Sequence, residues 1–155
     1  MTKDKLIAIS ATLKREDKTK FNAFCLEKDM RSGNTMRALI VWFKGLTWDS
    51  KKKFISKYLK ENRIARDSNT TSTHVYLPNK KEKKAIVDTV RELNYELDDP
   101  NISFTTILLS LIKWFQELNE TSLAGFIEKY YLPGTHNTLK VIEKSAKGKE
   151  IMVEV

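Results

Sequence analysis

Leu39-Ile40-Val41-Trp42-Phe43 returns 72 residues later in the chain as Leu111-Ile112-Lys113-Trp114-Phe115. The likeness extends over the 23 ungapped positions from Met36 to Tyr58, of which 10 are identical to the corresponding residues of 108–130. Self-similarity at a fixed spacing is the sequence signature of a duplicated structural unit. Because the match continues across a turn into a second helical pattern, we expect an internal duplication rather than two unrelated aromatic helices.

The charge of the chain is unevenly distributed. The 155 residues include 28 basic and 20 acidic side chains, a net charge of +8. Residues 1–70 alone carry 17 Lys and Arg against 8 Asp and Glu, a net charge of +9, so the remainder is close to neutral. A basic N-terminal half predicts a polyanionic partner, either nucleic acid or an anionic membrane surface. Charge that serves only solubility is the alternative.

Cysteine content and hydropathy predict a cytoplasmic protein. Cys25 is the only cysteine, so no intrachain disulfide can form, as is usual in a reducing compartment. The N-terminal residues lead into a short alternating segment instead of the long apolar stretch of a signal peptide. The longest uncharged run, Pro100–Ile112, is too short to cross a bilayer.

The first half of the chain has the pattern of one strand followed by three helices. Apolar and polar residues alternate over Leu6–Leu13, which is typical of a half-buried strand. The apolar face of this strand consists of Ile7, Ile9, Ala11 and Leu13. Apolar residues at helical spacing then predict helices over Lys14–Met30, up to about Leu46, and over Lys51–Asn62. We expect side-chain caps from Ser32 or Asn34 on the second helix and from Asp49 or Ser50 on the third.

The second half repeats this order after a polar linker at residues 65–70. The strand is predicted over Thr71–Leu77, with Thr73, Val75 and Leu77 on its inner face. The helices that follow end near Leu97, Leu118 and Leu132, and their expected caps are Asn79, Ser103, and Thr121 or Ser122. The distance from strand to tryptophan helix is eight residues longer here, so we expect an insertion in the first helix or in the turn after it.

One strand with two helices cannot bury its apolar faces or pair its backbone alone. We therefore expect a mainly α protein in which two strand–helix–helix copies, each with an extra helix, pair their strands into an antiparallel β-ribbon over one shared core. The predicted parts are a first copy at residues 1–64, a linker at 65–70, a second copy at 71–134 and a tail or hairpin at 135–155.

The two strands and the helices after them resemble the ribbon-helix-helix (Arc/MetJ/CopG-type) DNA-binding proteins. The resemblance is carried by Ile9-Ser10-Ala11-Thr12-Leu13 with Lys14-Arg15-Glu16, and by Thr73-His74-Val75-Tyr76-Leu77-Pro78. It covers about residues 6–46 and 71–118, whereas the third helices and the tail depart from the minimal pattern. Members of this family are usually homodimers of one unit, so the resemblance implies a fused pseudodimer, possessing both copies in one chain, that binds double-stranded DNA.

The resemblance also implies which residues contact DNA. A two-stranded ribbon fits the major groove, where its outward side chains meet base edges. The implied base-reading residues are Ala8, Ser10, Thr12, Ser72, His74 and Tyr76. Helix N-termini and flanking basic residues would hold phosphates. The implied phosphate contacts are Lys3, Lys5, Lys14, Arg15, Ser32, Gly33, Asn34 and Ser103.

Catalytic and metal patterns do not appear in the sequence. His74 and His136 have no ligand spacing with the single cysteine, and the five glycines form no phosphate-binding loop. We therefore expect neither an enzyme nor a cofactor. A transcriptional repressor is the leading prediction, and a plasmid partition or conjugation accessory protein uses the same ribbon. A protein–protein adaptor or antitoxin is the alternative from a different class.

Overall fold

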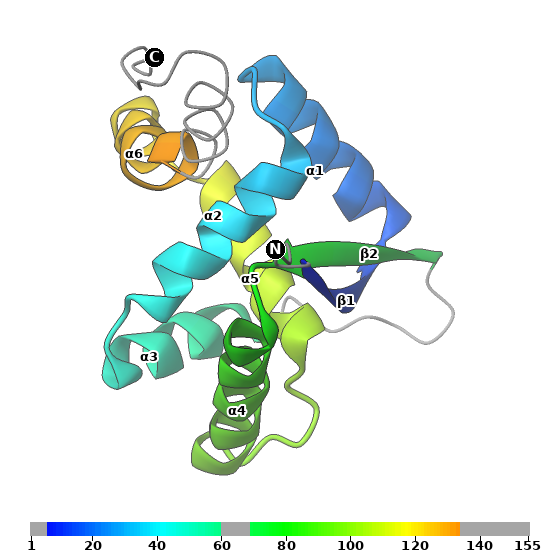
Figure 1. Cartoon of the computed structure of the whole chain (residues 1–155), viewed down its shortest axis with the longest axis vertical. Coiled ribbons are helices and arrows are strands. Elements are labelled where there is room, and N and C mark those ends of the chain that lie inside the picture. The colour runs from blue at the N-terminus through cyan, green and yellow to red at the C-terminus, as the bar shows by residue number, and fades with distance from the viewer. Residues whose placement is uncertain (1–5, 60–68, 134–155) are drawn as a thin grey trace, which may run out of the picture. The chain divides into compact units, whose positions relative to one another are not determined.

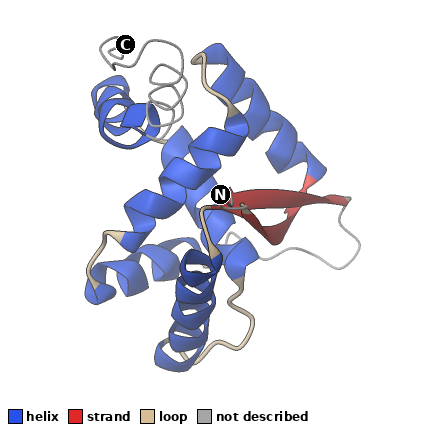
Figure 2. Cartoon of the chain, in the orientation of Figure 1, coloured by secondary structure: helices blue, strands red, loops and turns tan. Residues whose placement is uncertain are grey.

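A computed structural model describes residues 6–59 and 69–133 of the chain (Figure 1). The elements in order are β1 (Ile7–Lys14), α1 (Arg15–Glu27), α2 (Ser32–Lys44), α3 (Trp48–Tyr58), β2 (Thr70–Leu77), α4 (Lys80–Glu96), α5 (Phe104–Gln116), α6 (Glu120–Phe126) and the π-helical segment η1 (Ile127–Tyr131). This part of the chain is mainly helical with one two-stranded antiparallel sheet, as predicted (Figure 2). The predicted tail and residues 65–68 of the predicted linker lie outside the described residues.

Two compact units make up the chain, residues 1–116 and residues 117–155. The first unit contains the ribbon of β1 and β2 together with helices α1 to α5. The second contains α6 and η1, whose rings Phe126 and Tyr130 stack with centroids 5.4 Å apart.

The ribbon turns one apolar face toward the helices of the first unit. Its pairing register places Ile9 opposite Val75 and Ala11 opposite Thr73, so the inner faces predicted for the two strands coincide. The inner-face residues that are buried are Ile9, Ala11, Leu13, Thr73, Val75 and Leu77. Strand β1 packs on α5, and β2 packs on α2.

Helix α5 lies at the centre of this core. Its residues from Thr106 to Ile112 are all buried, which is the pattern of a helix surrounded by protein on every side. Its buried hydroxyl groups are satisfied locally, because Ser110 Oγ donates a hydrogen bond to the carbonyl oxygen of Thr106 at 2.8 Å. Each fully buried large apolar side chain contributes about 1.5–3 kcal/mol to stability.

Helices α1 and α4 end in the same way. In α1, the amides of Asp29 and Met30 donate to the carbonyls of Leu26 and Cys25, which forms a Schellman motif. The corresponding bonds in α4 run from Asp98 and Asp99 to Tyr95 and Asn94. Asp29 and Asp98 both adopt a left-handed backbone, with φ of 59° and 49°. Helix α4 has 17 residues and α1 has 13.

Three of the predicted helix caps are wrong and one is confirmed. Asn79 Oδ1 accepts from the amide of Glu82 at 3.0 Å, as predicted. Thr47 caps α3 instead of Asp49 or Ser50, and Asn119 caps α6 instead of Thr121 or Ser122. Helix α2 begins at Ser32 itself, so Arg31 is its N-cap residue and no side-chain cap bond forms. In each wrong case the observed N-cap residue lies one to three residues before the predicted cap, which places the predicted residue inside the first turn.

Candidate nucleic-acid interface

The outer face of the ribbon brings together the six residues predicted to read bases. The register pairs Ala8 with Tyr76, Ser10 with His74, and Thr12 with Ser72. Five of these side chains are exposed and Ala8 is half-buried. Alternate strand residues face the same side of a sheet, so the inner apolar residues oblige these six to share the opposite face. They form one continuous strip, which we call the ribbon strip.

Ser10 and His74 form a direct contact at the centre of the ribbon strip. Ser10 Oγ lies 2.9 Å from His74 Nδ1, within hydrogen-bonding distance. Nδ1 of His74 is therefore hydrogen-bonded to Ser10, and Nε2 is the ring nitrogen left for a ligand. Because an imidazole can donate or accept depending on its tautomer, this bond also couples the outward nitrogen to the state of the hydroxyl.

The outer edge of β1 is covered by the first turn of α5. The amide of Thr12 donates to Thr105 Oγ1 at 3.0 Å, so this amide is not part of the pairing with β2. Thr12 and Ser72 thus form a non-hydrogen-bonded pair, whose side chains approach more closely than those of the alternate pairs. Sequence reasoning missed Thr105. The sequence places Thr105 in the first turn of a predicted helix, but its hydrogen bond with the edge of β1 depends on the tertiary fold.

The start of α2 is open at the positions predicted to hold a phosphate. The first intrahelical bond runs from the amide of Thr35 to the carbonyl of Arg31, so the amides of Ser32, Gly33 and Asn34 precede it. A Cβ added at Gly33 would meet no atom within 4 Å. Backbone amides in such a first turn are suited to an anion.

The start of α5 differs from that of α2. Ser103 directly precedes the helix, and its amide donates to Thr106 Oγ1 at 3.1 Å. This amide already has a partner, so a phosphate at Ser103 would have to compete with the Thr106 hydroxyl.

Basic side chains flank the end of the ribbon that leads into α1. Arg15 Nε donates to Asn69 Oδ1 at 3.0 Å, and Lys18 Nζ donates to the carbonyl oxygen of Ser72 at 3.5 Å. Lys14 is half-buried at the last position of β1. Lys3 and Lys5 lie outside the described residues. Lys18 was not predicted, although its spacing from Arg15 placed both on one side of the helix.

The two tryptophans of the repeated sequence pack against each other. Trp42 of α2 and Trp114 of α5 are stacked, with ring centroids 3.9 Å apart, and Phe54 of α3 contacts both rings. Phe115 contacts Phe21 and Phe24 of α1 edge-on. These aromatic residues hold helices together instead of forming a stacking surface for single-stranded nucleic acid.

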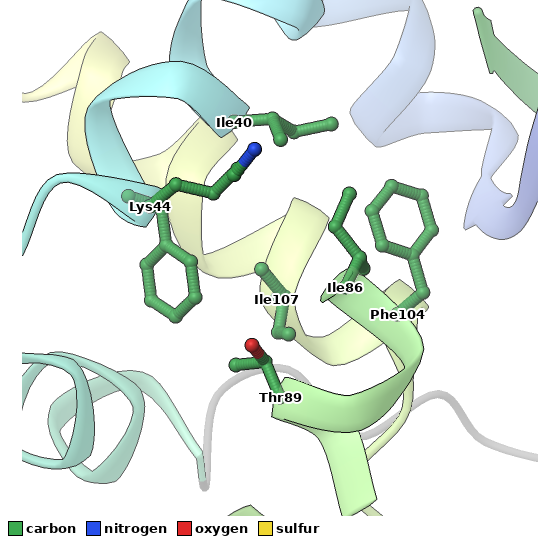
Figure 3. A pocket seen from close by; sticks show the side chains of 7 residues that line it. Ile40, Lys44, Ile86, Thr89, Phe104 and Ile107 are labelled. Carbon is green, nitrogen blue, oxygen red and sulfur yellow. The ribbon is translucent and has the colours of Figure 1, made fainter. Parts of the chain in front are cut away.

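A small pocket lies among α2, α4 and α5. Figure 3 shows the Lys44 side chain extending toward Ile40, with Ile86 and Ile107 lower in the view. Burial lowers the pKa of Lys44 below its usual range, and the charge of Lys51 adds to this effect. Lys44 also forms an ion pair with Glu82 of α4. The space inside is about that of one water molecule, too small for an effector.

The described residues lack a metal-binding cluster and a membrane-spanning helix. No group of three or more His, Cys, Asp or Glu side chains within residues 6–59 and 69–133 is arranged to hold a metal ion. No helix in the same ranges is long and apolar enough to span a membrane. Comparison of the chain with family models, with curated proteins and with solved structures finds no match.

Proposed function

We propose that this protein binds double-stranded DNA sequence-specifically by inserting the ribbon of β1 and β2 into the major groove. The single observation that supports this most is the pairing register, which places the side chains of Ala8, Ser10, Thr12, Ser72, His74 and Tyr76 on one outward face. A two-stranded ribbon has the width of the major groove, and each base pair presents a distinct donor and acceptor pattern there.

The groups available on the ribbon strip suit this role. The hydroxyls of Ser10, Thr12 and Ser72 donate or accept, His74 offers one outward nitrogen, and the ring of Tyr76 can pack on a thymine methyl. The open amides at the start of α2 and the basic residues beside β1 would hold phosphates and set the register of the protein on the duplex. A protein bound in this way would block a promoter, so transcriptional repression is the simplest biological role. Marking a plasmid site for partition or transfer is the alternative role.

The proposal includes the duplication of the strand–helix–helix unit within the chain. Four features of the first unit support it. Helices α2 and α5 have the same length and start 72 residues apart, and the corresponding tryptophans, Trp42 and Trp114, stack on each other. Helices α1 and α4 end in the same capping motif. The two strands correspond at a spacing of 64 residues, eight fewer than the spacing of the helices, so Ser10 corresponds to His74. These two residues face each other at the centre of the ribbon.

A partner protein is the second candidate, because two helices expose large apolar side chains. Leu26 of α1 is 77% exposed and Tyr95 of α4 is 84% exposed. Both occupy the same position, two residues before the C-cap of their helices. An adaptor or antitoxin that uses these residues would not depend on the ribbon strip.

A binding-site selection separates the two candidates. A random duplex library would be selected at ~150 mM salt, where exposed charges beyond the Debye length are largely screened. The wild type would be compared with a Ser10→Ala/Thr12→Ala/His74→Ala/Tyr76→Ala variant and with a Leu26→Ser/Tyr95→Ser variant. We expect one enriched motif with the wild type, loss of that motif with the first variant, and its retention with the second. A wild type that enriches no motif would reject the proposed function.

A further inference from the structure

The two ends of the ribbon strip differ in chemistry. At one end Ala8 lies opposite Tyr76, whose side chain is 49% exposed. At the other end Thr12 lies opposite Ser72. In a homodimer of one unit the two ends would be identical by symmetry. Here the corresponding positions hold different residues, since Ala8 corresponds to Ser72 and Thr12 to Tyr76 at the strand offset given above.

This difference changes what each end can recognise. A methyl group and an aromatic ring make apolar contacts, and the only apolar group on a base edge in the major groove is the thymine methyl. Two hydroxyls donate and accept hydrogen bonds and suit the polar edges of either kind of base pair. Thr12 also carries a methyl group but Ser72 does not, so the ribbon favours thymine more strongly beneath its Ala8–Tyr76 end than beneath its Thr12–Ser72 end.

The helices that begin at the two ends of the ribbon strip also differ in charge. Helix α4 begins beside the Ala8–Tyr76 end, and its first five residues, 80–84, comprise four Lys and one Glu. Helix α1 begins beside the Thr12–Ser72 end, and residues 15–19 comprise two basic and two acidic residues. Both basic residues of that stretch already form hydrogen bonds within the protein, Arg15 with Asn69 and Lys18 with the carbonyl oxygen of Ser72 in β2. The DNA phosphates beside the bound bases should consequently be attracted more strongly at the α4 end than at the α1 end.

We propose that the chain binds a non-palindromic duplex site in a single orientation, with thymine-containing base pairs beneath Ala8 and Tyr76 and with α4 over the adjoining phosphates. This inference rests on the proposed DNA-binding function. It goes beyond that function because a ribbon can read bases without distinguishing the two directions along a site.

Directed cleavage of DNA tests the orientation. Lys20→Cys and Ala85→Cys each place one thiol at the sixth residue of α1 or α4, and both positions are exposed. The only native cysteine, Cys25, is buried, so an iron–EDTA reagent would label the introduced thiol. Each labelled protein would be bound to the motif recovered by the library selection, and cleavage would be mapped on both strands. Unlabelled wild type is the control.

We expect each labelled protein to cut one flank only, with Lys20→Cys and Ala85→Cys cutting opposite flanks. The flank cut by Ala85→Cys should adjoin the thymine-rich part of the motif. A preference of roughly fivefold or more between flanks is expected, because one good base contact discriminates by ~1–3 kcal/mol. Equal cleavage of both flanks by each protein would overturn the inference while leaving the DNA-binding function intact.

A ribbon with matched ends supplies the decisive comparison. Ala8→Ser with Tyr76→Thr gives the first end the same two side chains as the second end. Combined with either labelled position, and at protein concentrations that saturate the duplex, this change should shift cleavage toward equal cutting of both flanks. If the changed ribbon keeps the full preference of the wild type, the chemistry of the ribbon ends does not set the orientation and the inference is wrong. Absence of any selected motif would instead reject the proposed function itself.

Discussion

Ser10 and His74 meet at the centre of the ribbon, with Ser10 Oγ 2.9 Å from His74 Nδ1. The contact joins residues 64 positions apart in the chain and lies on the exposed face, away from the core. It holds the imidazole in one orientation before any ligand arrives. In the proposed complex with DNA this side chain would then need no further ordering, and ordering a side chain at an interface typically costs about 0.5–1.5 kcal/mol.

Removal of the Ser10 hydroxyl should weaken site-specific binding. Ser10→Ala frees the His74 ring to rotate and to change tautomer, so we expect a loss of about 1 kcal/mol in specific affinity, roughly fivefold. Fluorescence anisotropy with the selected duplex and with an unrelated duplex measures this loss. Ser10→Thr keeps a hydroxyl and is the matched control. Equal affinity of all three proteins for the selected duplex would contradict a positioning role for Ser10.

Thr73 carries a buried polar atom on the inner face of the ribbon. Its Oγ1 has no hydrogen-bond partner among the described residues, and the residue is 4% exposed. Thr73→Val replaces the hydroxyl by a methyl group of similar size, so we expect a gain of about 1–2 kcal/mol in the free energy of unfolding. Urea denaturation measures the change. Thr71→Val, at a half-buried position of the same strand, should change stability much less. A destabilised Thr73→Val protein would indicate a partner for this hydroxyl.

The stacked tryptophans should be energetically coupled. Trp42 and Trp114 lie on different helices with ring centroids 3.9 Å apart, so each substitution removes the partner of the other. A double-mutant cycle with Trp42→Leu and Trp114→Leu should give a coupling energy of about 0.5–1.5 kcal/mol beyond the loss of buried area. Urea denaturation of the four proteins, monitored by circular dichroism, gives the four free energies of unfolding. Strictly additive effects would show that the stack contributes only through burial.

The sequence predicted the strands and the face each presents, because period-two alternation gives both at once. Ile9, Ala11, Val75 and Leu77 are buried as predicted, and Ser10, Thr12, His74 and Tyr76 are exposed. Helix beginnings were harder to predict. Ser32 and Asp49 are both good cap residues by type, yet Arg31 and Thr47 precede the helices. Cap preferences differ by only about 1 kcal/mol, so tertiary packing decides among neighbouring candidates.

The contacts around the candidate site could not be predicted from local pattern. The bond from the Thr12 amide to Thr105 joins residues 93 positions apart, and the bond from Lys18 to Ser72 joins residues 54 apart. Both arise only when α5 and α1 are packed against the ribbon. Alternation and helical periodicity specify which faces are buried, but they do not specify which side chains meet across two elements.

The residues with a left-handed backbone after α1 and α4, Asp29 and Asp98, are sites where substitution should raise stability. Asp29 has a φ of 59°, and a residue with a Cβ pays about 1–2 kcal/mol in this conformation. Asp29→Gly removes most of this strain but makes the unfolded chain more flexible, so we expect a net gain of about 0.5–1 kcal/mol. Thermal or urea unfolding measures it. Asp29→Ala, which keeps a Cβ, should give no gain. A less stable Asp29→Gly protein would mean that the aspartate side chain itself supports the turn.

Cys25 should make the stability of the protein fall at high pH. Burial raises the pKa of the Cys25 thiol to about 11, and a hydrogen bond with Thr35 opposes this only partly. An unfolded cysteine titrates near pH ~8.5, so as pH rises the unfolded state loses its proton first and is favoured. The stability that Cys25 contributes is therefore complete below about pH 8.5 and declines as pH rises toward about 11.

Urea unfolding of the wild type and of Cys25→Ala at pH 8 and pH 10 isolates this contribution, since lysines and tyrosines that titrate in the same range are common to both proteins. We expect a larger loss of stability between the two pH values in the wild type. Native Cys25 should also react with a thiol reagent only at the rate at which the protein opens. Parallel pH dependence of the two proteins, or rapid labelling of native Cys25, would show that the thiol is accessible and titrates as in the unfolded chain.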